Sequence, residues 1–181
     1  MKKLLLTLVV VLATHLVSAQ APDTSAPKID TTLLKVYNKN KVKTVQLKTD
    51  SLIMKDAKGK PAVQVVIYKS KQAAENKTVI VEFTDLSKTL GCISENDVIM
   101  VTFTDKSHLE LYQSGLYNCK GISTCHFRGT WRNVDKLETL LKKDIASVLF
   151  NSMTTSLEGR FTPGQAKTFR AALKAIDDYP F

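Results

Sequence analysis

The stretch VIMVTFTDKSHLELY, residues 98–112, decides the fold because it holds two alternating segments joined by a turn. In residues 98–103 an apolar side chain recurs at every second position on one face, and Leu recurs in the same way in residues 108–112. Asp105-Lys106-Ser107 lies between the segments and is typical of a tight turn. The stretch therefore predicts a β-hairpin that packs one face against a core.

The same alternation continues on both sides of this hairpin. Residues 145–150 are apolar on both faces, which indicates a central strand covered on each side. The other predicted strands, some of them weaker, cover residues 43–47, 52–55, 63–68, 78–84 and 122–127.

Two helices are expected near the C-terminus. Leucines spaced as one helical face predict a short helix near 134–142, with Asn133 as its N-cap. An amphipathic C-terminal helix is predicted near 163–177, because Thr162 and Gln165 form a capping box around Pro163. The expected fold class is therefore α+β, with an antiparallel β-sheet and these two helices.

The composition and the N-terminus indicate an exported chain with one domain. The chain has 181 residues, 44% of them hydrophobic and 24% charged, which excludes a disordered or fibrous protein. Residues 1–19 have a basic start, a short apolar run and small residues before a cut after Ala19, as in a signal peptide. An uncleaved membrane anchor is the alternative, disfavoured because Pro22 and Pro27 follow directly. Residues 20–30 are predicted to be a flexible linker, and residues 31–181 a single domain without a transmembrane helix.

Positive charge is concentrated in the first half of the chain. Residues 28–77 hold twelve lysines and no arginine against four acidic residues, whereas in residues 78–181 twelve basic residues balance twelve acidic ones. Such an asymmetry attracts polyanions, although lysines on edge strands also simply prevent aggregation. Nucleic acid is not expected, because this half has no arginine and only two aromatic residues. The candidate polyanion-binding residues are Lys39, Lys41, Lys43, Lys58 and Lys60.

Three short segments flank the strands of the hairpin: Gly91-Cys92-Ile93-Ser94-Glu95-Asn96-Asp97, Phe103-Thr104-Asp105-Lys106-Ser107 and Asn118-Cys119-Lys120-Gly121. Over about residues 91–150 the chain resembles a block in small, secreted, functionally uncharacterised proteins of the Bacteroidetes. The resemblance implies export and a sheet-based α+β domain, and it implies no known activity, cofactor or catalytic residue. The chain departs from that block at Lys106, where the turn usually has Gly, and by its additional Cys125.

The three cysteines of the chain allow one disulfide and one free thiol in an oxidising compartment. Within the resembling block Cys92 and Cys119 flank the hairpin, which favours a Cys92–Cys119 bridge. A Cys119–Cys125 bridge is the alternative. If the first bridge forms, Cys125 is expected to be a small buried residue of a strand.

Motifs for catalysis are missing from the sequence. It has no G-x-S-x-G, H-E-x-x-H, G-x-x-x-x-G-K or C-x-x-C motif. His108 and Glu110 share one strand face, and His126 could join them in a metal site for a hydrolase, although a solvated strand face is the favoured explanation of these residues. Trp131 beside Arg132 suits a partner contact, although Trp131 also suits the core beneath the short helix.

Two functions of different classes follow. The favoured one is a periplasmic or secreted, non-enzymatic binding or structural module without a cofactor, which contacts an anionic polysaccharide, lipopolysaccharide or an envelope protein. The other is a metal-dependent or other hydrolase that uses His108, Glu110 and His126.

Overall fold

The computed structural model describes residues 35–39, 42–49, 51–72, 76–95, 97–128, 132–152 and 154–180. In chain order the elements are β1 (Lys35–Lys39), β2 (Val42–Lys48), β3 (Leu52–Lys55), β4 (Pro61–Gln72), β5 (Asn76–Asp85), β6 (Val98–Phe103), β7 (His108–Tyr112), β8 (Ile122–Phe127), α1 (Leu137–Lys142), β9 (Ile145–Asn151), β10 (Ser156–Arg160) and α2 (Pro163–Asp178).

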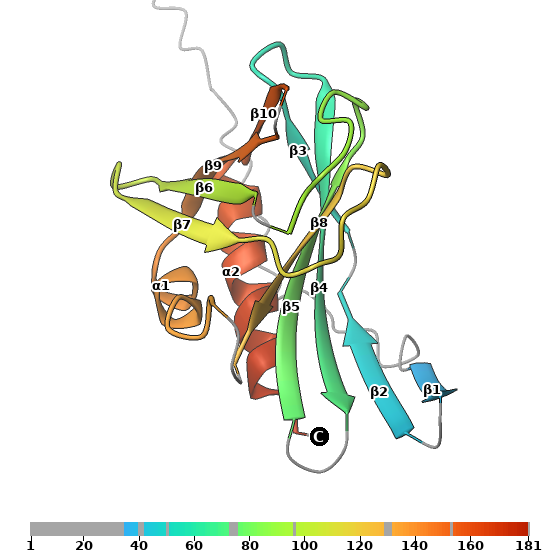
Figure 1. Cartoon of the computed structure of the whole chain (residues 1–181). Helices are drawn as coiled ribbons and strands as arrows, with labels where there is room; N and C mark the ends of the chain where they lie inside the picture. The colour runs from blue at the N-terminus through green and yellow to red at the C-terminus, as the bar shows by residue number, and fades with distance from the viewer. Residues whose placement is uncertain are drawn as a thin grey trace, which may run out of the picture.

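The strands form one antiparallel sheet that curves strongly around the core (Figure 1). Eight of them follow the order β8-β5-β4-β3-β10-β9-β6-β7. The β1–β2 hairpin also joins this sheet through β4, which pairs with β3 through its first half and with β2 through its second half. β5 pairs along the whole length of β4, so β4 and β5 form a long central hairpin.

The expected α+β class is wrong, because the described chain is mostly β. It has ten strands, while its two helices comprise only 6 and 16 residues. Two of the strands, β1 and β10, are too polar for apolar periodicity to reveal them. Their backbones are held by pairing with β2 and β9, and such pairing outweighs weak local preference.

The hairpin predicted from residues 98–112 is confirmed as β6 and β7. Ile99 lies opposite Leu111 and Val101 opposite Leu109 in its register. In the turn Lys106 has a φ of 66°, a left-handed conformation that favours glycine. The turn therefore holds a lysine in a backbone conformation where a glycine would be under less strain.

Among the described strands β7 pairs with β6 and β8 with β5, and the seam between β7 and β8 is closed by side-chain amides together with one backbone hydrogen bond. The side-chain amide of Asn133 accepts from the backbone N–H of Tyr112 and donates to its carbonyl, both at 2.8 Å. Gln113 Oε1 accepts from the backbone N–H of Thr124 at 2.6 Å, and the N–H of Ser114 donates to the Thr124 carbonyl at 2.7 Å. The side-chain amides of Asn133 and Gln113 thus make hydrogen bonds to Tyr112 and Thr124 that a neighbouring strand would otherwise make.

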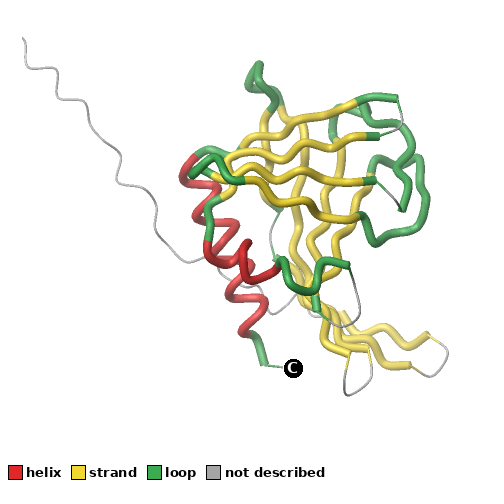
Figure 2. Tube along the Cα trace, turned by 60° about the vertical axis from the view of Figure 1, so that its left-hand side comes forward, coloured by secondary structure: helices red, strands yellow, loops and turns green. Residues whose placement is uncertain are grey.

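Helix α2 covers one side of the curved sheet (Figure 2). The capping box predicted at Thr162 and Gln165 is present. The apolar face of α2 is buried in the core and consists of Ala166, Phe169, Ala172, Leu173 and Ile176.

Asn133 is not the N-cap that the sequence predicted for the short helix. Helix α1 begins later, and its N-cap is Lys136, which makes no side-chain capping bond. Asn133 is fully buried instead, and its side-chain amide hydrogen-bonds to the backbone N–H and carbonyl of Tyr112.

No helix in the described ranges is long and apolar enough to span a membrane.

Candidate functional site

The connection between β7 and β8, residues 113–121, holds the most exposed of the large apolar side chains in the described structure. Leu116 is 83% exposed and Tyr117 is 66% exposed, although both are large enough to be buried in an ordinary core. Next in exposure come Val134 at 48% and Leu86 at 40%. We call residues 113–121 the clamped loop, for the contacts described next.

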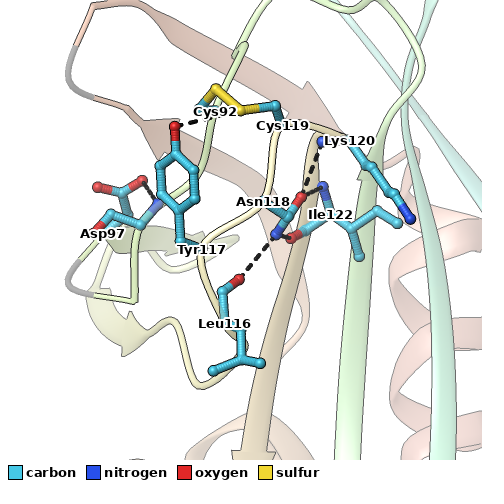
Figure 3. Close-up of a disulfide and its surroundings, with 9 residues drawn as sticks. Cys92, Asp97, Leu116, Tyr117, Asn118, Cys119, Lys120 and Ile122 are labelled. Carbon is cyan, nitrogen blue, oxygen red and sulfur yellow. Dashed lines mark hydrogen bonds between the residues drawn. A yellow bond between two sulfur atoms is a disulfide. The ribbon is translucent and has the colours of Figure 1, made fainter.

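A disulfide between Cys92 and Cys119 ties the clamped loop to the connection between β5 and β6 (Figure 3). The predicted Cys92–Cys119 pairing is thus confirmed and the Cys119–Cys125 alternative is wrong. Cys125 is a free, buried residue of β8, and its burial raises the pKa of the thiol. Its thiol is therefore protonated and unreactive in the folded chain.

Asn118 is the hydrogen-bonding centre of the clamped loop (Figure 3). Its side-chain amide donates to the carbonyls of Leu116 and Ile122, and its Oδ1 accepts from the backbone N–H groups of Lys120 and Ile122. Its backbone exchanges two further hydrogen bonds with Ile93, of 2.7 and 3.0 Å. The amide of Asn118 thereby uses both donors and both acceptor positions internally.

Two glycines let the clamped loop approach its neighbours closely. Gly121 has a φ of 68°, and a Cβ there would lie 3.0 Å from the Cβ of Asp85. A Cβ on Gly115 would lie only 2.5 Å from Thr124 Oγ1 and 3.0 Å from the amide nitrogen of Gln113. The loop is therefore packed closely against Thr124 and Gln113 at one end and against Asp85 at the other.

A shallow groove of about 560 Å³ runs along the clamped loop, from Gly115 to Thr124. The Tyr117 hydroxyl lies 3.4 Å from Cys119 Sγ, and it is the donor because a disulfide sulfur carries no proton. Among the described residues that line the groove, Lys120 is the one that carries a charge. The surface that the loop exposes to a ligand is therefore mainly apolar and consists of the Leu116 side chain and the Tyr117 ring.

The predicted polyanion-binding lysines do not share one surface. Lys39 ends β1 and Lys43 lies in β2, while Lys41 falls outside the described residues. Lys58 and Lys60 lie in the exposed turn between β3 and β4, at the N-terminal end of β4. Since β2 pairs with the last residues of β4, the two groups are at opposite ends of that strand.

Lysines are dense where β1 and β2 join the central hairpin. We call this region, residues 35–39, 42–48, 68–72 and 76–80, the basic arm. It projects away from the helix-covered body (Figure 2). These residues include seven lysines and no acidic residue. Sequence reasoning found the charge but not its position, because the pairing of β2 with the end of β4 is not visible in composition.

The three residues of the alternative metal site are not brought together. His108 and Glu110 lie on β7, where His108 Nδ1 is 3.2 Å from Thr102 Oγ1. His126 lies on β8, and its burial lowers the pKa of the imidazole. Among the described residues no three His, Cys, Asp or Glu side chains are grouped closely enough to hold a metal ion. The geometry therefore gives the hydrolase hypothesis no support.

The predicted partner contact at Trp131 and Arg132 is only half described. Trp131 lies outside the described residues. Arg132 is exposed, and its guanidinium carbon lies 3.9 Å from the ring centre of Tyr112. Lys136 Nζ lies 4.0 Å from the same ring centre and donates to the carbonyl of Glu110. Both cations thus pack on β7, which accounts for Arg132 without a partner.

Sequence reasoning missed Leu116 and Tyr117 altogether. A signal was present, since the two residues stand between Gly115 and Asn118 in a segment without strand alternation. Large apolar residues in such a connection lack the periodicity that would bury them.

Comparisons with models of protein families, with curated proteins and with solved structures found no match to this chain. The resemblance to secreted proteins of the Bacteroidetes therefore stays a prediction.

Proposed function

We propose that this chain is an exported, non-enzymatic binding module that contacts a protein partner of the cell envelope through the clamped loop. The signal peptide predicted over residues 1–19 and the Cys92–Cys119 bridge support export, because disulfides persist in oxidising compartments. A periplasmic location and full secretion both satisfy these observations.

The observation that carries the proposal is the exposure of Leu116 and Tyr117 on a loop that is already rigid. Large apolar side chains normally leave water, and burying each at an interface contributes about 1.5–3 kcal/mol. The disulfide and the hydrogen bonds of Asn118 hold the loop in one conformation before binding. Binding therefore costs little further ordering of the loop, which is a property of interaction hot spots.

The polar groups around the loop define the partner's chemistry. Asn118 has no hydrogen-bonding capacity left for the hydroxyl groups of a sugar. Lys120 is the one cation of the groove, so the loop lacks the cationic ring that attaches a protein to an anionic lipid surface. An electrically neutral, apolar pocket on a folded protein matches this surface best in both charge and polarity.

Photo-crosslinking tests the proposal. A photoreactive phenylalanine derivative at position 117 should crosslink one envelope protein of the producing cell, and the same group at position 134 should not. The purified partner should then bind the unmodified chain, with an affinity reduced at least tenfold by Leu116→Asp. The matched control Val134→Asp changes another exposed apolar residue and should leave the affinity unchanged. Equal affinities for both variants would exclude the loop as the contact.

A further inference from the structure

The basic arm combines a high density of lysines with an absence of counter-charges in its strands. The seven lysines are distributed over four neighbouring strands, which lie about 4.8 Å apart in a sheet. No Asp or Glu occurs in the described residues of these strand segments. By register, Lys43, Lys71 and Lys77 occupy positions on one face of these strands, and Lys35, Lys39 and Lys48 occupy positions on the other face.

Lys69 has a structural role within the body. It is buried, and its ammonium donates to the carbonyls of Asp177 and Tyr179, both at 2.6 Å, at the C-terminal end of α2. A cation at that end of a helix is stabilising, so Lys69 is not part of a ligand site. The remaining lysines of the arm are Lys35, Lys39, Lys43, Lys48, Lys71 and Lys77.

The register places two of these lysines directly opposite each other. Lys71 of β4 pairs with Lys77 of β5, and Val45 of β2 lies on the other side of Lys71. Like charges at directly opposed positions of an antiparallel pair destabilise the sheet. A bound anion would neutralise this pair, so the register itself points to an anionic ligand.

We propose that the basic arm is a second binding site, and that its ligand is a linear polysaccharide with a negative charge on each repeating unit. The inference rests on the proposed export, which would bring the arm to such polymers, and it is independent of the clamped loop. Charge complementarity along the strands suits an extended chain of regularly spaced anions.

Two other polyanions fit the arm less well. Nucleic-acid sites use arginine and stacking aromatic residues, and the arm has no arginine and only Tyr37 and Tyr68. A lipid surface is bound with help from large apolar side chains, but the connections at the end of the arm read Asn40-Lys41 and Ala73-Ala74-Glu75.

Heparin, a linear sulfated polysaccharide, is the probe for this site. The mature chain should bind it, and the slope of log K against log salt should fall by roughly one for each lysine removed. Lys77→Glu should lower the affinity severalfold and, because it creates an opposite-charge pair with Lys71, raise the melting temperature. Lys60→Glu makes the same change of net charge at the other end of β4 and should leave heparin affinity within twofold.

Three outcomes would overturn the inference. Equal losses in Lys77→Glu and Lys60→Glu would show that net charge alone determines retention. Binding to phosphatidylglycerol vesicles without binding to heparin would assign the arm to lipid. Tighter binding to single-stranded DNA than to heparin would assign it to nucleic acid.

One further variant separates this inference from the proposed function. Leu116→Asp should keep full heparin affinity while losing the protein partner. N-terminal sequencing of the native protein tests export by itself, since it should begin at Gln20, whereas the heparin measurement uses purified mature chain.

Discussion

The clamped loop and the basic arm lie at opposite ends of the β4–β5 hairpin, whose ten cross-strand pairs span about 30 Å. At the clamped loop the polar groups are satisfied within the chain, and apolar side chains are left over. At the arm the backbone is paired in strands whose sequence contains lysines and no acidic residue. One end therefore presents apolar side chains and the other a basic sequence, and the two ends suit ligands of different chemistry.

Removal of the disulfide should have the largest effect on stability, and it should act at the clamped loop and not at the basic arm. Replacing both Cys92 and Cys119 by Ser should lower the free energy of unfolding by about 3–4 kcal/mol, because the bridge closes a loop across 27 residues. Urea unfolding measures this change, with Cys125→Ser as a control that leaves the bridge intact. Heparin affinity of the folded double variant should be unchanged, and a loss would mean that the two ends are not independent.

Removal of the Asn118 side chain should have the next largest effect. Asn118→Ala deletes four side-chain hydrogen bonds and should lower the free energy of unfolding by about 2–3 kcal/mol. Asn151→Ala, at an exposed position at the end of β9, is the control and should cost less than about 0.5 kcal/mol. Hydrogen exchange should show faster opening of the clamped loop only in the first variant. Unchanged exchange there would show that the disulfide alone holds the loop.

Lys69 offers a test within the arm. Lys69→Met keeps the aliphatic part but leaves two carbonyls at the end of α2 without their donor, so stability should fall by about 1–2 kcal/mol. Lys71→Met is the matched control; because it removes one charge of the Lys71–Lys77 pair, it should not lower stability, and it should weaken heparin binding. Thermal unfolding together with salt elution from heparin distinguishes the two. If Lys69→Met weakened heparin binding more than Lys71→Met does, Lys69 would belong to the heparin site and not only to the end of α2.

The smallest expected effect is a difference in pH dependence. Burial lowers the pKa of His126 in the folded chain below its ordinary value of 6.5. The stability that this shift contributes is therefore fully present above about pH 6.5 and is lost as the pH falls through the folded pKa. His126 lies beside the clamped loop, where its backbone N–H donates to Ser114 Oγ. Melting temperatures at pH 7.5 and 5.0 should thus differ less in His126→Gln than in the parent chain.

Local signals in the sequence predicted the elements that depend on local chemistry. The hairpin of residues 98–112, the capping box at Thr162 and the Cys92–Cys119 pairing are confirmed. The hairpin and the capping box are determined by residues close together in the sequence, and the disulfide joins two of only three cysteines.

The elements that depend on distant partners were not predictable in this way. β10 has the polar sequence of a loop, and it is a strand because β9 pairs with it. The position of Lys69 under the end of α2 joins residues more than one hundred positions apart, which no local pattern encodes. Leu116 and Tyr117 were missed for the opposite reason, since a periodicity search finds residues that are buried and passes over those that are not.

The seam between β7 and β8 has a consequence for the solubility of the chain. An exposed strand edge is a template for pairing with another molecule, and aggregation commonly starts there. At this seam the side chains of Asn133, Gln113 and Asn118 occupy hydrogen-bonding groups of both edges. A second copy of the chain would have to displace these amides before it could add a strand. The seam therefore protects the β7 and β8 edges against strand addition, although these two strands are not paired with each other.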